Sequence, residues 1–557
     1  MNQPPGFRRQ ASGWSLVVRR WSLALITVLS AALPSAHSQV VAKKGGKPGE
    51  MRVFGQNLVT LPSSSPLYQI QIMVRAGSAD DPQGKEGMAN LVAQALIEGG
   101  FGDPKNPVTK EKLADITRPW GDAALPSVRV DKEATTFSMT MPREVLPQFM
   151  AQVLKPMFTQ PLWLQAELDR LRREALTEIQ SRLRFEDAES LGLLTLDNWL
   201  FAGSNLDHLT AGTVKGLQAV TREDLANFYK QYYQRGNMYV ATSINDPARL
   251  GELMDALPAG QPMFMRPMHI IRMVPTPGRH VLIVTQPNAI ATGLHLGFPF
   301  DLNRVSDDYW PLFVANVSFG LHRDDFGRLY HEIRVDRGYN YGDYSYLEYL
   351  PGRPFSLFPP PNTPRTHQYF SIWIRPVGQQ YTHFILKAMT AELDRIRKEG
   401  LTPQQVAEAK VKARTLYLNY AESLSRQLGY RLDDMFYGMK DRGYLQQMLA
   451  QIDAVTPEQA NTAIKEYLQV ENLKYVIVTN ENAGETLAND IADGANVTPK
   501  TLADYHISEP IPAEKKALLD QDEQWKAYPL NIPRANIHVV KAEQLFETAG
   551  EPVGSER

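Results

Sequence analysis

The chain has 557 residues, of which 43% are hydrophobic and 22% are charged, a balance that is ordinary for a soluble globular protein. Its length predicts more than one domain, because a single hydrophobic core rarely grows past about 250–300 residues. The formal net charge of -2 gives no reason to expect nucleic acid or an anionic membrane as a partner.

The first 38 residues have the layout of a secretory signal peptide. Arginines precede an apolar stretch, Trp21–Leu33, and small residues at Ala36 and Ser38 supply a cleavage site before Gln39. We therefore predict export to the periplasm with cleavage after Ser38. A short membrane anchor is the alternative, although the apolar stretch is short for a membrane span. The sequence does not distinguish Sec from twin-arginine export.

The chain contains no cysteine, which rules out disulfides and a lipid-modified cysteine after the signal. No later segment reaches the length of a membrane helix, so no membrane span is expected once the signal is removed. The mature protein must be held together by its core alone.

The mature chain alternates strand and helix patterns from about Gln69 to Asn480. Residues 68–74 alternate apolar and polar side chains, as a half-buried strand does. A turn-rich connection, Gly77–Gly87, leads to helical spacing over Met88–Ile97, which a glycine pair ends. A long helix rich in leucine, arginine and glutamate is predicted over Leu164–Arg184.

An internal repeat is the strongest sign of organisation. Residues 220–244 and 455–478 each have the pattern of a helix followed by a strand. In the two copies Thr221 and Thr456 are plausible N-caps, with acidic residues in the first turn. Identities recur without a gap at Val220/Val455, Thr221/Thr456, Glu223/Glu458, Lys230/Lys465, Tyr232/Tyr467 and Asn237/Asn472. Matched caps, helix lengths and strands together predict a duplicated unit of more than about 200 residues.

The repeat predicts an α+β protein built from two homologous α/β lobes, each an antiparallel-type sheet covered by helices. The predicted boundaries are 39–257 for the first lobe, 258–278 for a proline-rich linker, 279–483 for the second lobe and 484–557 for a C-terminal extension. The extension contains Trp525, Tyr528 and an apolar run over 537–540. We therefore expect it to pack on the body of the protein.

Three segments carry a resemblance to a known family. Gly77–Ala89 (GSADDPQGKEGMA) matches the connection G-S-x-x-[DE]-P-x-G-x-x-G-x-A that precedes the H-x-x-E-H helix of M16 (pitrilysin-type) zinc peptidases. Leu217–Met238 is similar to the family's lobe-closing helix. Asp325–Tyr341 resembles its S-R-L-x-x-E-I-R-x-x-R-G-x-x-Y signature, with Gly327 in place of the serine. The resemblance spans most of Gln69–Asn480 and implies the M16 fold, in which this chain would form half of a clam-shell assembly.

The resemblance also implies that the zinc site is lost. In the family two histidines four apart bind zinc, a glutamate beside them takes a proton from the metal-bound water, and a glutamate on a later helix is the third ligand. Here the first three positions are Asn90, Ala93 and Gln94. A carboxamide is a poor substitute for imidazole on zinc, and alanine cannot act as a base. We expect no metal and no zinc chemistry in this chain.

The third-ligand position is Glu178. Without the histidines, the simpler interpretation is a solvated or ion-paired helix residue, with Glu174 one turn away on the same face. The scattered histidines include no pair at i, i+3 or i, i+4 spacing, and Val335 stands where His331-Glu332 would need a second histidine. No replacement metal site is predicted.

The second lobe keeps a pair of residues that family members use to hold the substrate backbone. Arg334 and Tyr341 have the identity and the spacing of this arginine and tyrosine. An arginine supplies donors for peptide carbonyls, and a phenol can hydrogen-bond a developing oxyanion. The alternative is an Arg–Tyr packing pair in a tyrosine-rich loop. The surrounding signature favours the substrate-binding role.

A chain with this pair but without the metal helix resembles the non-metal subunit of a heterodimeric M16 peptidase. The resemblance implies a partner subunit that carries H-x-x-E-H and zinc, unfolded or short peptides as substrates, and no activity of this chain alone. A catalytically inactive peptide-binding or structural subunit is the alternative. An independent enzyme has no support, since the sequence shows no G-x-S-x-G motif, cysteine or phosphate loop. Insertions near 105–120 and 351–364 would close the chamber or dock the partner, and the sequence does not decide which.

Overall fold

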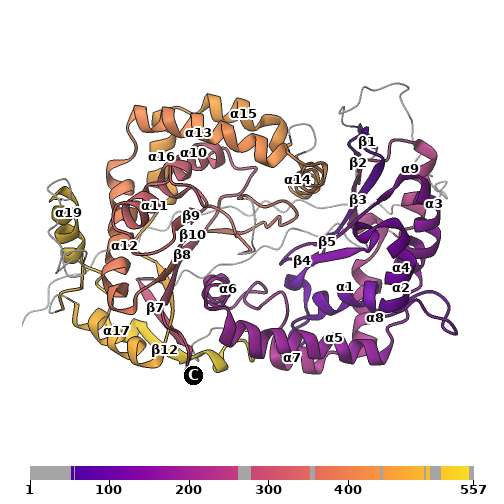
Figure 1. Ribbon diagram of the computed structural model, residues 1–557, viewed down its shortest axis with the longest axis horizontal. Coiled ribbons are helices and arrows are strands. Elements are labelled where there is room, and N and C mark those ends of the chain that lie inside the picture. Colours follow the sequence, from indigo (N-terminus) through magenta and orange to yellow (C-terminus); the bar gives the residue numbers. More distant parts are fainter. Residues whose placement is uncertain are drawn as a thin grey trace, which may run out of the picture. The chain divides into compact units, whose positions relative to one another are not determined.

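The computed structural model of the chain describes residues 52–54, 57–260, 277–351, 358–439, 443–494, 497–501 and 516–550. The described residues contain two six-stranded sheets with helices packed on them (Figure 1). The predicted signal peptide, most of the predicted linker and part of the 351–364 insertion lie outside the described residues.

The first sheet belongs to the first lobe. Its strands are β1 (Arg52–Phe54), β2 (Leu58–Thr60), β3 (Leu67–Val74), β4 (Ser127–Val130), β5 (Thr135–Pro142) and β6 (Met238–Thr242). They lie in the order β1-β2-β6-β3-β5-β4. Neighbours are antiparallel except β2 and β6, which run parallel.

The helices of the first lobe begin with the helix that the glycine-rich connection introduces. They are α1 (Met88–Glu98), α2 (Lys110–Thr117), α3 (Leu146–Phe149), α4 (Lys155–Thr159), α5 (Gln165–Thr177), α6 (Ala188–Leu200), α7 (Val214–Ala219), α8 (Arg222–Tyr232) and α9 (Pro247–Asp255). The predicted long helix is α5 together with a π-helical continuation, Glu178–Glu186. Thr221 caps α8, as predicted, and forms a capping box with Asp224.

The second sheet belongs to the second lobe and includes one strand of the C-terminal extension. Its strands are β7 (His280–Thr285), β8 (Thr292–Phe300), β9 (Asp343–Tyr346), β10 (Gln368–Val377), β11 (Lys474–Thr479) and β12 (Ile537–Lys541). They lie in the order β12-β7-β11-β8-β10-β9. β7 runs parallel to both β11 and β12, and the other neighbours are antiparallel.

The second lobe and the extension supply the remaining helices. They are α10 (Tyr309–Gly320), α11 (Arg328–Tyr330), α12 (Thr382–Glu399), α13 (Pro403–Ala421), α14 (Leu424–Phe436), α15 (Tyr444–Ala454), α16 (Pro457–Tyr467), α17 (Glu481–Asp493) and α19 (Lys516–Ala527). Thr456 caps α16 with the same capping box as Thr221 in the first lobe. None of the helices in the described ranges is long and apolar enough to cross a bilayer.

The two lobes share one topology, as the internal repeat predicts. The first sheet contains the order β2-β6-β3-β5-β4, and the second contains the order β7-β11-β8-β10-β9. When the strands of each series are numbered along the chain, the two orders are the same. In each lobe the last strand lies parallel to the first and follows the capped helix of the repeat. The prediction of an α+β protein with two homologous lobes is confirmed, and each mainly antiparallel sheet also contains parallel neighbours at one edge.

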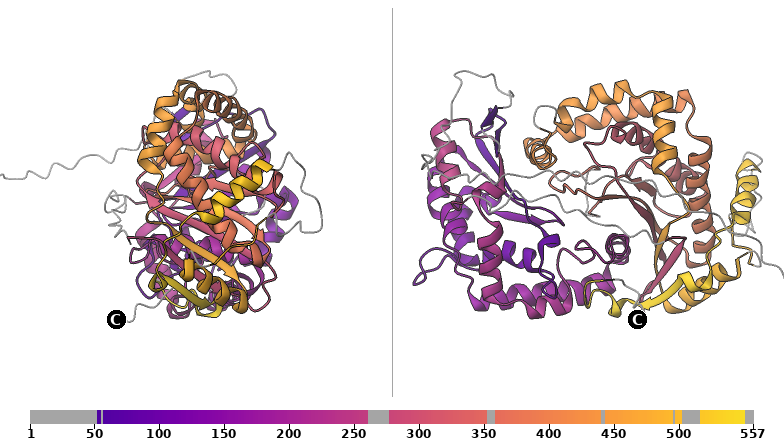
Figure 2. Two further views of the ribbon diagram at one scale, coloured as in Figure 1. Left: turned by 90° about the vertical axis from the view of Figure 1, so that its left-hand side faces the viewer. Right: turned by 180° about the vertical axis from the view of Figure 1, so that it is seen from behind.

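Each sheet is covered on one face by a helix from the other lobe (Figure 2). α6 of the first lobe lies against β8 and β11, and α14 of the second lobe lies against β3 and β6. The amide of Gln71 in β3 donates to both the carbonyl and the hydroxyl oxygens of Ser425, each at 3.0 Å. Gln71 is therefore buried, although the alternating sequence of β3 predicts a strand with one face in solvent.

A buried group of charges joins the lobes, and we call Asp131, Lys132, Asp197 and Arg365 the interlobe network. The guanidinium of Arg365 donates to Asp131 at 2.9 Å and to Asp197 at 2.8 Å. The ammonium of Lys132 lies 3.7 Å from Asp197 and donates to the side-chain oxygen of Asn198 at 3.0 Å. All four members are buried, so their charges interact in a medium of low dielectric constant.

The C-terminal extension contacts both lobes. β12 pairs with β7, and Trp525 of α19 is buried and donates to Glu392 at 3.0 Å. Beyond β12, the carbonyl oxygen of Leu545 accepts a hydrogen bond from the buried Arg184 of the first lobe. The extension thus continues the second sheet and then binds the first lobe.

Candidate functional site

The three positions of the lost zinc motif lie on α1. Ala93 is fully buried, whereas Asn90 and Gln94, four residues apart, are half-buried. The helix packs against α5 and α8. Ala93 stands at the position of the family's general base, and its methyl group belongs to the apolar core of the first lobe.

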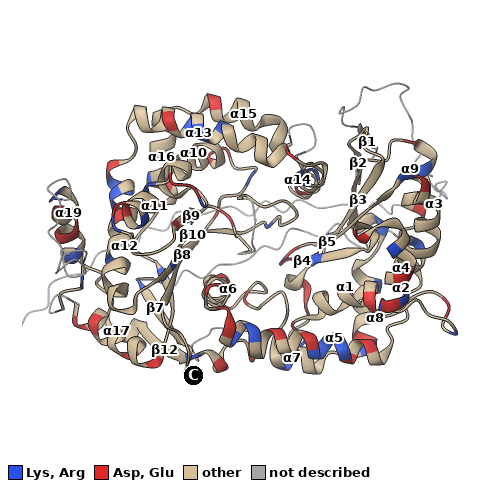
Figure 3. Cartoon of the chain, in the orientation of Figure 1, with Lys and Arg blue, Asp and Glu red and all other residues tan. Residues whose placement is uncertain are grey.

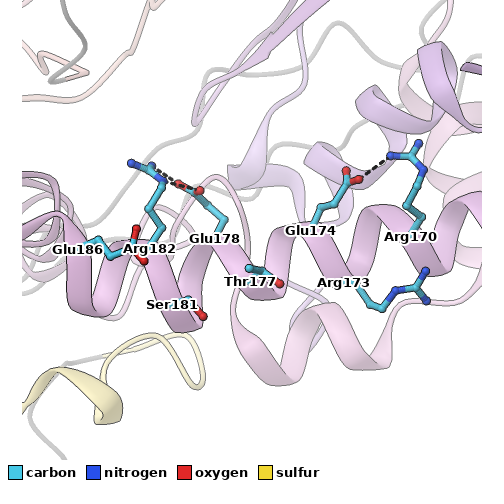
Figure 4. Close-up of a pocket in the computed structure, with 8 residues that line it drawn as sticks. All are labelled: Arg170, Arg173, Glu174, Thr177, Glu178, Ser181, Arg182 and Glu186. Atoms are coloured by element: carbon cyan, nitrogen blue, oxygen red, sulfur yellow. Dashed lines mark hydrogen bonds and ion pairs between the residues drawn. The ribbon is translucent and has the colours of Figure 1, made fainter. Parts of the chain in front are cut away.

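Glu178 forms an ion pair. Its carboxylate accepts hydrogen bonds from the guanidinium of Arg182, four residues on, and Glu174 pairs with Arg170 at 2.8 Å (Figure 4). The half-exposed Glu178 lies in an open hollow of about 500 Å³ with these three residues. Acidic and basic residues follow one another along α5 (Figure 3), so the geometry agrees with the ion-paired interpretation.

These residues do not fit zinc. The carboxylate of Glu178 is bound to Arg182, Ala93 offers no donor atom, and the two carboxamides are neutral oxygen or nitrogen groups of low affinity for this ion. In the part of the chain that the structure describes, no three His, Asp or Glu side chains are grouped closely enough to hold a metal ion.

Arg334 and Tyr341 are brought together, as the sequence predicts. Arg334 lies in a π-helical turn, His331–Val335, and its guanidinium carbon is 5.1 Å from the centre of the Tyr341 ring. Tyr341 is 75% exposed, a large value for an aromatic side chain. Arg334 forms no ion pair with any described residue. Arg334 is half-buried and Tyr341 is exposed, so a peptide could reach the phenol and the part of the guanidinium that stays open to solvent.

Hydrogen bonds of Asn340 fix the loop that carries Tyr341. The buried amide of Asn340 donates to the Asp343 carboxyl at 2.9 Å and to the carbonyl oxygen of Arg375 at 3.0 Å, and its oxygen accepts from the N–H of Gly342. Gly342 has a φ of 147°, and a Cβ there would lie 2.0 Å from the hydroxyl of Tyr344. A glycine is therefore required beside Tyr341.

The sequence does not predict the neighbours of this pair. The backbone N–H of Arg375 donates to the carbonyl oxygen of Gly342 at 3.1 Å, and the Arg375 side chain binds Glu189 of α6 at 3.1 Å. Arg375 lies near the end of an apolar strand and Glu189 in the other lobe, so no local pattern marks either residue. Arg375 and Glu189 are recognised as neighbours only in the structure, where the two lobes are in contact.

The comparison with known proteins agrees with this geometry. Residues 219–412 match the family described as Peptidase M16 inactive domain. The predicted resemblance to the M16 family is confirmed.

Proteins similar to this chain match most of its length. An uncharacterised zinc protease of Streptomyces coelicolor is 24% identical over 76% of this chain and 86% of its own length. The non-peptidase homolog YmxG of Helicobacter pylori is 22% identical over 75% of this chain and 90% of its own. The crystal structure of a peptidase M16 inactive domain from Pseudomonas fluorescens has a TM-score of 0.63, with 21% identity, 77% of this chain and 97% of that chain covered. The M16 fold is thus shown across both lobes.

The glycine-rich connection holds the start of α1 in place. The carboxylate of Asp81 accepts from the backbone N–H groups of Gly87 at 2.6 Å and Ala89 at 2.7 Å, which caps α1. A Cβ at Gly77 would lie 2.2 Å from the carbonyl oxygen of Asp131, so glycine is required there. The connection therefore positions α1 whether or not the helix carries zinc ligands.

His208 is a buried titratable group beside this cap. Its Nε2 lies 3.0 Å from the carbonyl oxygen of Ser78 and 3.3 Å from Asp81. Burial opposes a charged ring, but the contacts with Asp207 and Asp81 outweigh burial and raise the pKa of His208 above 6.5. Burial also raises the pKa of Asp81 above its usual range, against the opposing effect of His208.

We expect this histidine to make the stability of the protein depend on pH. Because the folded state holds the His208 proton more tightly than the unfolded chain does, its contribution is complete below pH ~6.5 and is lost as the pH rises through the higher folded-state pKa. The stability lost on His208→Gln, measured by urea unfolding at pH 6 and pH 8, should be larger at pH 6. His331→Gln, at an exposed histidine, is the control. A loss for His208→Gln that is equal at both pH values would contradict the prediction.

Proposed function

We propose that this chain is the exported, non-metal subunit of an M16-type zinc endopeptidase. In this proposal it contributes half of a peptide chamber and the Arg334–Tyr341 pair to a partner subunit that carries H-x-x-E-H. Unfolded or short peptides are the substrates. The mature subunit begins at Gln39, after periplasmic removal of the signal peptide.

The contact between the half-buried Arg334 and the exposed Tyr341 is the observation that carries this proposal. A guanidinium without a carboxylate partner among the described residues has its donors available for the carbonyl groups of a peptide backbone. The phenol is placed to donate to the oxyanion that develops when water attacks the scissile carbonyl. The zinc of the partner would polarise that carbonyl and activate the water. The division of labour follows, since this chain holds and orients the peptide but has no group that activates water.

Reconstitution tests the proposal. An unfolded quenched-fluorescence peptide is incubated with the mature chain, with an M16 subunit that carries H-x-x-E-H, or with a mixture of the two. We expect cleavage by the mixture alone. Arg334→Ala or Tyr341→Phe should lower kcat/KM of the complex by about 10²–10³-fold, the usual effect of removing one oxyanion donor. Arg397→Ala, at a half-exposed residue paired with Glu471, is the control and should leave kcat/KM unchanged.

Two outcomes would overturn parts of the proposal. Cleavage by the metal-free single chain at the rate of the mixture would remove the need for a partner. Unchanged activity of the complex with Arg334→Ala and with Tyr341→Phe would favour the second candidate, a catalytically inactive peptide-binding or structural subunit. That candidate is supported by the similarity to the protein named non-peptidase homolog in Helicobacter pylori.

A further inference from the structure

A buried arginine holds the turn that carries Arg334. Arg337 follows the π-helical turn His331–Val335, three residues after Arg334. Its side chain is fully buried, and its Nη1 donates to the carbonyl oxygen of Glu332 at 2.7 Å. Arg337 therefore binds the backbone of the same turn from which the Arg334 side chain extends.

Helix α19 of the C-terminal extension supplies the other partners of Arg337. The Nε of Arg337 donates to the carboxylate of Asp522 at 2.7 Å, and its Nη2 donates to the side-chain oxygen of Gln521 at 2.7 Å. The ring of Trp525 lies 4.2 Å from the guanidinium carbon, within the range of a cation–π contact. Asp522 and Trp525 are both buried. The guanidinium is thus fixed between the turn and α19.

Helix α19 is itself anchored to the second lobe. The indole N–H of Trp525 donates to Glu392 at 3.0 Å, and the ammonium of Lys387 donates to the carbonyl oxygen of Lys526 at 2.7 Å. Both acceptor–donor pairs join α19 to α12, and the two helices lie against each other (Figure 1). The anchored helix can therefore hold Arg337, and with it the turn, in one position.

The exposed contacts of the turn are weaker than this buried one. Glu332 is paired with Arg395 of α12 at 3.1 Å, but Arg395 is about one-third exposed, and pairs open to solvent contribute little. Arg337 and Asp522 are buried, and removal of one partner of a buried pair leaves the other charge without compensation. The conformation of the turn should therefore depend on Asp522.

The two members of the substrate-binding pair have separate supports. Tyr341 lies in the loop that Asn340 fixes through its hydrogen bonds to Asp343 and to the backbone. Arg334 lies in the turn that Arg337 binds, and the carbonyl oxygen of Arg334 accepts from the N–H of Gly338 at 3.0 Å. Loss of the contacts with α19 should consequently displace Arg334 and leave Tyr341 in place.

We infer that Asp522 is a positioning residue for Arg334, because α19, acting through Arg337, fixes the turn that places the Arg334 guanidinium carbon 5.1 Å from the centre of the Tyr341 ring. The inference rests on the proposed function and gives the C-terminal extension a part in substrate binding. Asp522 touches no peptide in this assignment. A displacement of about 1 Å in a group that orients the substrate can lower the rate about 10²-fold.

Hydrogen exchange tests whether α19 fixes the turn, and it needs no partner subunit. In the mature chain, Asp522→Ala should increase deuterium uptake over residues 331–338, because the N–H groups of a loosened turn open more often. Asp522→Asn keeps an acceptor oxygen for Arg337, so it should change the uptake in the same direction but less, and it serves as the test if Asp522→Ala does not fold. Glu523→Ala is the matched control on α19, since Glu523 is exposed and paired with Lys526 at 3.0 Å. It should leave the uptake unchanged.

Kinetics of the reconstituted complex test whether Asp522 acts through Arg334. Asp522→Ala should lower kcat/KM by about 10–10²-fold in the otherwise wild-type complex and should cause no further loss when added to Arg334→Ala. A role in general stability would lower kcat/KM by the same factor in both backgrounds.

Two results would overturn the positioning role. One is unchanged uptake over residues 331–338 in both Asp522 variants, and the other is an equal loss of kcat/KM with and without Arg334. If the wild-type mixture cleaves no peptide, the proposed function fails, and the exchange result still decides whether α19 holds the turn.

Discussion

Replacing Arg365 with methionine is expected to lower the free energy of unfolding by about 3–5 kcal/mol. The change removes the cation that binds both Asp131 and Asp197 and leaves the two carboxylates buried, with Lys132 as the remaining cation of the interlobe network. Methionine keeps most of the volume, so the loss reports on charge rather than on a cavity. Urea unfolding followed by tryptophan fluorescence measures the effect.

A matched variant separates burial from ion pairing. Arg397→Met removes an arginine of a half-exposed pair with Glu471, and such pairs contribute about 0–1 kcal/mol. The double variant Arg365→Met/Asp197→Asn should recover part of the loss, because the network then holds one cation and one carboxylate in place of one cation and two carboxylates. An effect of Arg365→Met as small as that of Arg397→Met would show that the network does not hold the lobes.

We expect a second large effect when a glutamate is placed at position 93, where the family has its general base. Ala93 is 0% exposed, so Ala93→Glu introduces a carboxyl group into the apolar core of the first lobe and should cost about 2–4 kcal/mol at pH 8. Burial would raise the pKa of the introduced carboxyl. The cost should therefore be smaller at pH 5, where the group is nearer to its neutral form, and should grow as the pH rises.

Gln94→Glu provides the control on the same helix. Gln94 is half-buried, so the same charge can reach water there and should cost less than about 1 kcal/mol. Urea unfolding of both variants at pH 5 and pH 8 tests the comparison. Equal costs for the two variants would mean that the core around Ala93 still has room for a polar base.

Local signals in the sequence predicted much of this fold. The caps at Thr221 and Thr456 depend on residues three positions away, so short segments contain all the information needed, and both helices form as expected. The lost zinc positions are likewise visible as single residue identities at Asn90, Ala93 and Gln94. The pairing of Arg334 with Tyr341 was predictable because both residues lie in one short segment with a turn at Gly338 between them.

Contacts between the lobes could not be predicted in this way. Arg365 reaches partners 234 and 168 residues away, and nothing in the sequence around it differs from an ordinary loop. The burial of Gln71 depends on α14, which follows more than 300 residues later. The same limit applies to the contact of Arg375 with Glu189, 186 residues away.

Helix α6 of the first lobe covers the second sheet, and α14 of the second lobe covers the first sheet. This arrangement affects how the protein folds. A lobe produced by itself would lack the helix that covers one face of its sheet and would expose the apolar residues that this helix buries, among them Val59 and Met73 of the first lobe. Neither half is then an autonomous folding unit, and the second half must be synthesised before the first can complete its packing. Denaturation should accordingly be one cooperative transition for both halves, and a chain truncated between them should be cleared by proteases rather than accumulate as a stable fragment.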